Sequence, residues 1–503
     1  MSSLQEHLPI LQILVPLFGA ILTAFTRSGT TAWAIAAVSS AISPFISAAL
    51  LIKVTTTGQP ISYVMGPWAA PWGIEYRVDL LNGFILLLVS LIGLVSIPYA
   101  RKSVAQEIDS HKQSWFYTMY LLCLTGLLGI CITGDAFNAF VFLEVSSLST
   151  YTLIALGRQR RALVSAYQYL VMGTIGATFY IIGVGLIYIV TGTLNFVDLA
   201  ARIGPAMPEL SRPIIAALAF MTVGISLKLA LFPLHVWLPN AYAFAPSFAT
   251  AFLAGTATKV AIYLLLRIFY TFFSNAIPFY SLPISEFLLV LSLAAMFVAS
   301  FTAIFEENAK RMLAYSSVAQ IGYITLGIAL ANKIGLAGSL VHMFNHAIMK
   351  TALFFALGAM VYRTGVARMS SLSGIGRKMP ITTAAFVVAG LGLIGVPGTA
   401  GFISKWYLAM GAIEHGWIWL VFLIVLSSLL AVVYVGRFIE IAYFREPSSD
   451  IADSHEPPLS MLAPLIALAA ATIYLGFDTR LTGGVARQIA DFLLSGVVLG
   501  GTQ

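Results

Sequence analysis

Apolar runs of about 20 residues recur along the whole chain, and this is the length that an α-helix needs to cross a bilayer. About 14 such runs can be placed, near residues 8–26, 32–52, 80–99, 114–133, 136–156, 165–191, 213–238, 247–268, 286–305, 312–331, 337–362, 381–411, 417–440 and 459–477. Of the 503 residues, 59% are hydrophobic and 9% are charged, which leaves little material for a soluble domain. We therefore predict an all-α integral membrane protein, a single polytopic membrane domain over residues 1–503.

Two of the predicted spans contain a proline that should break the helix. Pro233 cannot donate a hydrogen bond to the carbonyl of Leu229, and Pro397 cannot donate to that of Leu393. Carbonyls freed at membrane depth need protein or water partners, so such breaks are tolerated where they line a cavity. Paired broken helices, one in each half of a chain, are typical of transporters built from inverted repeats. The repeat itself is faint in this sequence, and the two breaks alone do not establish it.

The distribution of the 27 Lys and Arg residues predicts how the chain lies in the membrane. Four of them fall inside predicted spans, 15 on the side of the loops at 101–102, 158–161, 310–311 and 377–378, and eight on the other side. Because cytoplasmic loops carry the excess of basic residues, we expect both termini on the outer, periplasmic side of a prokaryotic cytoplasmic (inner) membrane. No basic residue precedes the first apolar run, which predicts a retained span rather than a cleaved signal.

Charges well inside the predicted spans, away from their ends, are few, and all but one are lysines: Lys228, Lys259, Lys350 and Lys405. An uncompensated charge at the centre of a membrane helix costs about 2.5–3.5 kcal/mol, so each lysine is expected to have a partner or a use. Glu144 is the only acid well inside a span. If it lies beside Lys228, the two form either a structural ion pair or a pair in which the carboxylate sets the proton affinity of the lysine. The sequence leaves both interpretations open.

Histidines add to this set of titratable groups. His342, His346 and Lys350 recur every four residues and so share one helix face. Imidazoles at that spacing can pass a proton through intervening water, because their ordinary pKa of ~6.5 makes both charge states accessible. Plain hydrogen bonding between helices is the competing interpretation, and a metal pair is disfavoured by the lysine on the same face. His235, seven residues after Lys228, is expected on nearly the same face as an entry or exit residue, or as an interfacial one.

Together these residues predict a hydrated lane for protons, which runs from Glu144 and Lys228 through Lys259 and the histidine face to Lys405. Lys405 is either a terminal proton-release group or an anchor close to the surface. No acidic cluster offers the oxygen ligands that Na⁺ requires, so direct Na⁺ binding to this chain has weak support. Two cysteines are too few for a disulfide framework or a four-ligand metal site. We expect no cofactor and no metal.

Four motifs resemble those of a known family: 228–239 (KLALFPLHVWLP), 245–247 (APS), 310–317 (KRMLAYSS) with 320–323 (QIGY), and 342–350 (HMFNHAIMK). They are similar, in the same order, to the antiporter-like, proton-translocating subunits of respiratory complex I and of Mrp-type cation/proton antiporters. The resemblance covers roughly residues 75–445. It implies inverted five-helix repeats over 114–268 and 286–440, between N-terminal helices over 1–110 and C-terminal helices over 459–503. It also implies a Glu–Lys pair at Glu144 and Lys228, a central lysine at Lys259 and a terminal group at Lys405.

The lysine at the terminal position and the chain length are most similar to the D-type subunits of Mrp antiporters. The resemblance thus implies a proton-translocating subunit of a multisubunit Na⁺/H⁺ antiporter, with antiporter-like and small helical membrane subunits as partners and no nucleic acid. A proton-pumping subunit of a complex I-like or membrane-bound hydrogenase complex is the close alternative. A membrane-embedded lipid-linked transferase, using His342, His346 and Glu144, is the hypothesis from a different class. Asn240 and Asn308 stand where the family often has acids, which puts loop ion pairs in doubt.

Overall fold

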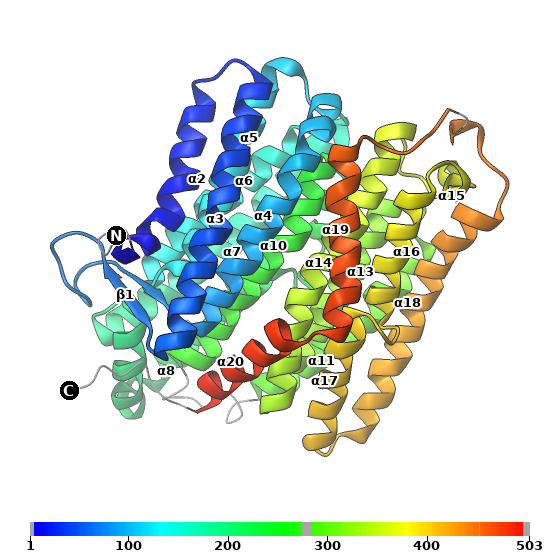
Figure 1. Cartoon of the computed structure of the whole chain (residues 1–503). Helices are drawn as coiled ribbons and strands as arrows, with labels where there is room; N and C mark the ends of the chain where they lie inside the picture. Colours follow the sequence, from blue (N-terminus) through cyan, green and yellow to red (C-terminus); the bar gives the residue numbers. More distant parts are fainter. Residues whose placement is uncertain (1–4, 274–282, 452, 496–503) are drawn as a thin grey trace.

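The computed structural model describes residues 5–273, 283–451 and 453–495, which form a bundle of long helices (Figure 1). The first half holds α2 (Leu8–Ala24), α3 (Gly29–Thr57), α4 (Leu80–Glu107), α5 (Gln113–Ile132), α6 (Ala136–Ala155), α7 (Arg160–Thr191), α8 (Phe196–Leu229), α9 (Trp237–Phe244) and α10 (Ser247–Arg267). The second half holds α11 (Ile284–Ala294), α12 (Ser300–Phe305), α13 (Ala309–Ala329), α14 (Lys333–Thr364), α15 (Ile375–Lys378), α16 (Pro380–Ile394), α17 (Ala400–Glu414), α18 (Ile418–Phe444), α19 (Leu459–Phe477) and α20 (Val485–Leu494). The predicted all-α membrane architecture is confirmed.

The number of spans differs slightly from the predicted 14. Twelve of the described helices are long and apolar enough to cross a membrane, or thirteen if α16 and the segment before it, bent by 110°, count as one span. Predicted span 8–26 is the 17-residue α2, and predicted span 381–411 is divided into α16 and α17, of 15 residues each. These three helices are shorter than the ~20 residues that a crossing usually takes. The inverted repeats and their boundaries stay predictions.

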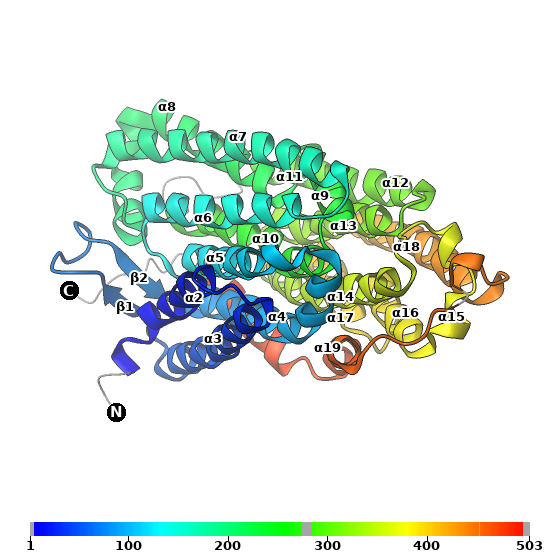
Figure 2. The same ribbon diagram turned by 90° about the horizontal axis from the view of Figure 1, so that it is seen from above.

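The long helices occupy two different environments, although all are apolar. In each of α10, α13 and α14, 94% of the most apolar stretch is buried inside the protein, whereas the shares for α7 and α18 are 39% and 33%. Seen from above, α10, α13 and α14 lie in the middle of the bundle, between α7 on one side and α18 on the other (Figure 2). Lys259 on α10 and the histidine face of α14 therefore belong to helices that are surrounded by protein rather than by lipid.

A small β-hairpin lies at one end of the bundle. Strands β1 (Ile61–Val64) and β2 (Glu75–Val78) pair antiparallel, with Ile61 opposite Val78. The next residue, Asp79, caps α4, because its carboxylate accepts hydrogen bonds from the backbone N–H groups of Leu81 and Asn82. The hairpin and α20 lie at the end of the bundle opposite α15 (Figure 1). Which end faces the cytoplasm stays a prediction.

The first helix break begins earlier than the sequence predicts. Predicted span 213–238 would place Lys228 in the middle of a helix, but α8 ends at Leu229 and Lys228 lies in its last turn. Ala230 follows in the left-handed conformation with φ 59°. Leu231 donates to the carbonyl of Ser226 rather than to that of Leu227, so the helical pattern ends here, and Pro233, which has no N–H, cannot donate to the Leu229 carbonyl.

One carbonyl at this break accepts from a side chain that the sequence did not suggest. The indole Nε1 of Trp237, in the first turn of α9, donates to the carbonyl of Leu227 at 2.9 Å. The Trp237 ring also stacks on Tyr169 of α7, with ring centroids 3.7 Å apart. Trp237 is 3% exposed, so this donor is fixed inside the protein where α7, α8 and α9 meet.

The second break lies between α16 and α17 and matches the sequence prediction more closely. Leu393 and Ile394 end α16 with carbonyls that accept from the ammonium of Lys405 in α17. Gly395 follows with φ 91°. A side chain at Gly395 would place its Cβ 2.9 Å from Cδ of Lys405, so this position needs glycine both for its conformation and for the passage of the lysine.

Replacing Trp237 by phenylalanine tests the role of the indole at the first break. The ring stack on Tyr169 is retained, but the Leu227 carbonyl loses its side-chain donor and keeps only the backbone N–H of Ala230 at 3.3 Å, so we expect the free energy of unfolding to fall by about 0.5–1.5 kcal/mol. Thermal unfolding of the purified protein measures the effect. Trp406→Phe is the matched control, because Trp406 is 57% exposed. Equal melting temperatures for the two variants would contradict this role.

Candidate functional site

Lys228 and Glu144 are in contact. The ammonium of Lys228 lies 3.6 Å from Oε1 of Glu144 in α6, and their side chains are 4% and 27% exposed. The same ammonium donates to Oγ of Ser147 at 2.6 Å. Sequence reasoning missed Ser147, although its spacing of three residues from Glu144 puts both on one face of α6. The carboxylate of Glu144 and the hydroxyl of Ser147, both on α6, thus face the ammonium of Lys228 at the first helix break.

Lys259 is buried deep in α10, and no carboxylate of the described residues forms an ion pair with it. Its side chain is fully buried, and its ammonium donates to the carbonyl of Ala254 and to Oγ1 of Thr258, the latter at 3.4 Å. Both partners belong to α10 itself.

Lys350 and His346 lie on one face of α14, as the four-residue spacing predicts. The ammonium of Lys350 donates to the carbonyl of Leu313 at 2.8 Å and to Oγ of Ser316, both in α13. The imidazole of His346 is fully buried, and neither of its nitrogens has a hydrogen-bond partner among the described residues. A buried polar group of this kind is usually satisfied by an ordered water, so the surroundings of His346 are suited to water.

His342 joins three helices. Its ring stacks parallel to that of His346, with centroids 6.1 Å apart. Its Nδ1 lies 2.7 Å from Oγ of Ser404 in α17, and its Nε2 lies 2.8 Å from Oε1 of Gln320 in α13. Oε1 of Gln320 can only accept, so Nε2 carries a proton, whereas the Ser404 hydroxyl can donate to Nδ1 or accept from it; the site therefore accommodates the ring as a neutral or a doubly protonated imidazole. The sequence could have indicated Ser404, which directly precedes Lys405.

Lys405 is held by oxygens at the second helix break. Its ammonium donates to the carbonyls of Leu393 at 3.1 Å and Ile394 at 2.8 Å, and to Oγ of Ser428 in α18 at 2.9 Å. It also lies 4.5 Å from the ring centroid of Tyr323. The prediction that the Leu393 carbonyl is free to accept from another group is confirmed. Lys405 is 7% exposed, so it is a buried group rather than a surface anchor.

His235 is not where the sequence places it. Because α8 ends at Leu229, His235 lies in the segment between α8 and α9 and does not share a helix face with Lys228. Its ring faces Tyr315 of α13, with centroids 6.3 Å apart, and its buried Nδ1 has no partner among the described residues. The break thus turns His235 towards the second half of the chain.

The two departures from the family pattern have local roles. Asn308 caps α13 by accepting from the backbone N–H of Arg311 at 3.1 Å, and Asn240 donates to Gln168 at 3.3 Å. Among residues 5–273, 283–451 and 453–495, no three His, Cys, Asp or Glu side chains come together as metal ligands. Glu144 contacts Lys228, whereas His342 contacts Ser404 and Gln320. These contacts do not join Glu144 to the histidines, as the site of a lipid-linked transferase would require.

The chain belongs to the NADH:quinone oxidoreductase/Mrp antiporter transmembrane family, whose model matches residues 133–431. It is therefore an antiporter-like membrane subunit of the Mrp or complex I type. It is 42% identical to the NADH-quinone oxidoreductase subunit N of Desulforudis audaxviator, over 97% of this chain and 99% of that protein. It is 29% identical to the D subunit of the Na(+)/H(+) antiporter of Alkalihalophilus pseudofirmus, over 97% of each chain.

Two solved membrane complexes contain a chain of the same fold. A chain of the Mrp complex from Dietzia sp. matches with a TM-score of 0.88 and 26% identity, over 99% of this chain and 100% of the other. A chain of the membrane-bound sulfane sulfur reductase, an archaeal respiratory membrane complex, matches with a TM-score of 0.89 and 28% identity, over 98% and 99%. The sequence resemblance to this family is confirmed, whereas the Mrp type is not distinguished from the complex I type.

The two histidines of α14 should differ in their contribution to stability. His342→Leu removes the donor to the buried Oε1 of Gln320 and one hydrogen bond of Ser404, which still donates to the Gly401 carbonyl, so we expect the free energy of unfolding to fall by about 1–3 kcal/mol. His346→Leu removes a ring with no protein hydrogen bond and should cost less. Thermal unfolding of both variants compares them directly. A larger loss in the His346 variant would show that His346 has the stronger partners.

Proposed function

We propose that this chain is a proton-translocating subunit of a multisubunit cation/proton antiporter of the Mrp type. Protons would move along buried side chains: Glu144, Lys228, Lys259, His342, His346, Lys350 and Lys405. The observation that carries the proposal is that Lys228, alone among the buried lysines of the described residues, has a carboxylate within 4.0 Å. The other lysines of the lane are held by carbonyls and hydroxyls.

The difference in partners suggests how a proton is driven along the lane. An ammonium beside a carboxylate is stabilised in its charged form, whereas a buried ammonium that faces only neutral dipoles is stabilised less. Neutralising Glu144, or moving it away, would release the proton of Lys228 towards the middle of the bundle. Lys259 and Lys350, each with only neutral oxygens as hydrogen-bond acceptors, are suited to hold a proton briefly and pass it on.

Water and histidine would connect the lysines. His346 has two buried nitrogens without a protein partner among the described residues, which is what a water-filled segment requires. His342 contacts Ser404, the residue next to Lys405, and so links α14 to the second break. Lys405 would then be the terminal group that exchanges the proton with one side of the membrane.

The same side chains argue against a path for Na⁺ through this chain. Buried lysines repel a metal cation, and the lane contains a single carboxylate, whereas Na⁺ and other hard cations are bound by several oxygen ligands. Exchange of a cation would therefore take place elsewhere in an assembly with other membrane subunits. Residues of α7 and α18 leave large apolar surfaces exposed, which suit neighbouring subunits and lipid of a prokaryotic inner membrane.

A redox-driven proton pump is the second candidate. The 42% identity to a protein named as an NADH-quinone oxidoreductase subunit favours it, and the side chains of the lane would work in the same way. The two candidates differ only in what supplies the energy, a cation gradient or an electron donor.

Lys228→Ala tests the proposed function. In inverted vesicles that contain the complete assembly, we expect the variant to lose proton translocation by at least tenfold, because the lane loses its paired lysine. Glu144→Gln should have a similar effect, because this variant lacks the carboxylate that stabilises the charged form of Lys228. Quenching of an acridine dye reports ΔpH. Lys53→Ala is the control, since Lys53 is an exposed residue at the end of α3. Wild-type translocation in the Lys228 variant would refute the proposal.

The energy source is tested in the same vesicles. For an Mrp-type antiporter, a pulse of NaCl should dissipate a ΔpH imposed by another pump, with no electron donor present. For a redox-driven pump, ΔpH should form only after addition of the electron donor and should not respond to Na⁺. Whichever response is found, Lys228→Ala should abolish it.

A further inference from the structure

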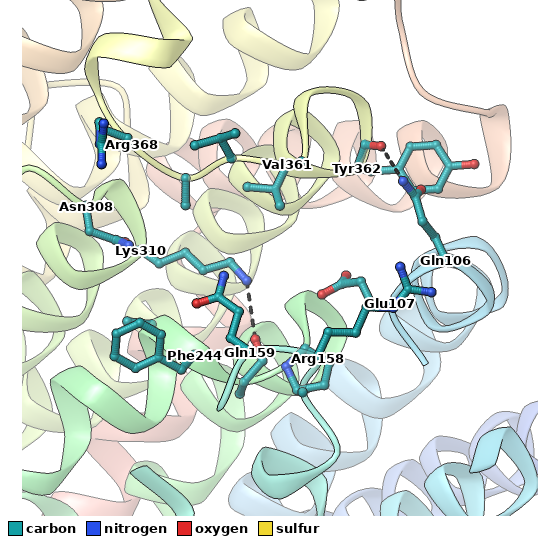
Figure 3. Close-up of a pocket in the computed structure, with 17 residues that line it drawn as sticks. Gln106, Glu107, Arg158, Gln159, Phe244, Asn308, Lys310, Val361, Tyr362 and Arg368 are labelled. Atoms are coloured by element: carbon teal, nitrogen blue, oxygen red, sulfur yellow. Dashed lines mark hydrogen bonds between the residues drawn. The ribbon is translucent and has the colours of Figure 1, made fainter. Parts of the chain in front are cut away.

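A cavity of about 340 Å³ opens at the end of the bundle where α4, α9 and α14 end and α13 begins (Figure 3). We call it the vestibule and define it by Glu107, Arg158, Phe244, Lys310 and Val361, which line it together with other residues of these segments. The segment at 365–368, just before α15, also contributes to its wall. The vestibule is therefore at the end of the bundle that the basic loops predict to be cytoplasmic.

The inner wall of the vestibule holds a partly buried acid, Glu107, and a buried base, Lys310, which do not contact each other. Lys310, which the sequence places in a loop, is 5% exposed, and its ammonium donates to Oγ of Ser247 at 3.1 Å and to the carbonyl of Ala245 at 3.3 Å. The carboxylate of Glu107 accepts from the backbone N–H of Ser247 at 2.9 Å and from the hydroxyl of Ser103 at 2.8 Å. Ser247 thus lies between the two charges, which do not form an ion pair.

The vestibule ends close to the proposed lane. Lys310 is in the first turn of α13, and the carbonyl of Leu313, three residues further on, accepts from the ammonium of Lys350. Three residues of helix correspond to a rise of about 4.5 Å. Ser316, in the turn beyond Leu313, is the second acceptor of Lys350. Lys310 of the vestibule and the oxygens that hold Lys350 therefore lie on neighbouring turns of one helix.

We propose that the vestibule is the place where the lane exchanges protons with water at this end of the bundle, with Glu107 and Lys310 as the exchanging groups. This inference rests on the proposed function. The Glu107 carboxylate takes a proton from water and becomes neutral. When Lys350 has passed its own proton on and is a neutral amine, Lys310, no longer stabilised by that charge, gives it a proton through water and is itself left as an amine. Glu107 then passes its proton to Lys310, so both groups return to their charged forms and one proton has moved inward.

The same steps in reverse carry a proton outward, so the vestibule serves either direction of transport. Arg158 and Arg368 add positive charge to its lining, which disfavours entry of hydrated metal cations. A proton can still cross such a lining, because it moves along water and titratable side chains. The vestibule is thus suited to protons and poorly suited to Na⁺, which agrees with the side chains of the lane.

Blocking the vestibule with a thiol reagent tests the proposal. Val361→Cys places a thiol in the lining, and Ser370→Cys places one on an exposed position at the same end of the bundle, outside the lining. The native Cys123 and Cys131 are fully buried and should not react. Inverted vesicles with the complete assembly are treated with 2-(trimethylammonium)ethyl methanethiosulfonate. We expect reaction of both introduced thiols, at least a fivefold loss of proton translocation for Val361→Cys, and no loss for Ser370→Cys.

Every other outcome contradicts the vestibule proposal, and the outcomes differ in whether the proposed function is contradicted as well. If wild-type vesicles translocate protons but modified Val361→Cys is as active as before treatment, the vestibule proposal is wrong and the proposed function stands. If Val361→Cys fails to react, the vestibule is not open to water and the proposal is equally wrong. If wild-type vesicles translocate no protons, both fall together.

The two charged residues are tested by a second comparison. Glu107→Gln and Lys310→Met should each lower translocation at least fivefold, whereas Lys310→Arg should retain the charge but not the proton exchange, because arginine does not release its proton. A purely structural role for Lys310 predicts instead that Lys310→Arg restores activity. Assembly of the complex is measured for each variant, so a loss caused by misfolding is recognised.

Discussion

Burial of ammonium groups without carboxylates is the constraint on which the rest of this structure depends. A charge in the membrane interior needs oxygens around it, and this chain contributes them from backbone carbonyls and hydroxyls of neighbouring helices. Lys350 is satisfied across the interface of α13 and α14, and Lys405 across the break between α16 and α17. The positions of these lysines therefore determine which helices must pack in the centre and where a helix must stop.

The carboxylate of Glu144 makes the set of buried lysines asymmetric. All the buried lysines of the described residues lie in the same kind of low-polarity surroundings, but only Lys228 has an opposing charge within 4.0 Å. This difference distinguishes Lys228 from the other buried lysines, and it comes from the single side chain of Glu144 in α6. If the proposed function is right, a change in the neighbours of α6 in the assembly is a way to control the whole lane.

Much of the fold could be predicted from the sequence, because apolar runs of membrane length and prolines act locally. The shared face of His342, His346 and Lys350, and the carbonyl freed at Leu393, were predicted for the same reason, whereas the positions of Lys228 and His235 were wrong because α8 ends at Leu229. The neighbours of these residues could not be. Ser147, Gln320 and Trp237 meet their partners across helix interfaces, and apolar helices look alike in sequence whether they face protein or lipid. The buried state of Lys310 was missed because a basic residue at a span end usually lies in a loop.

The carbonyls at the two helix breaks accept hydrogen bonds from different kinds of donor. The two breaks therefore respond differently to a change in protonation. The indole of Trp237 has one N–H and does not lose it, so its hydrogen bond to the Leu227 carbonyl at the first break does not depend on protonation. Lys405 has three acceptors and, as an ammonium, three N–H groups; as a neutral amine it has two. As a neutral amine, Lys405 would therefore leave one of the three oxygens without a donor. The hydrogen bonds that close the second break thus vary with the protonation of the lysine, whereas the bond that closes the first does not.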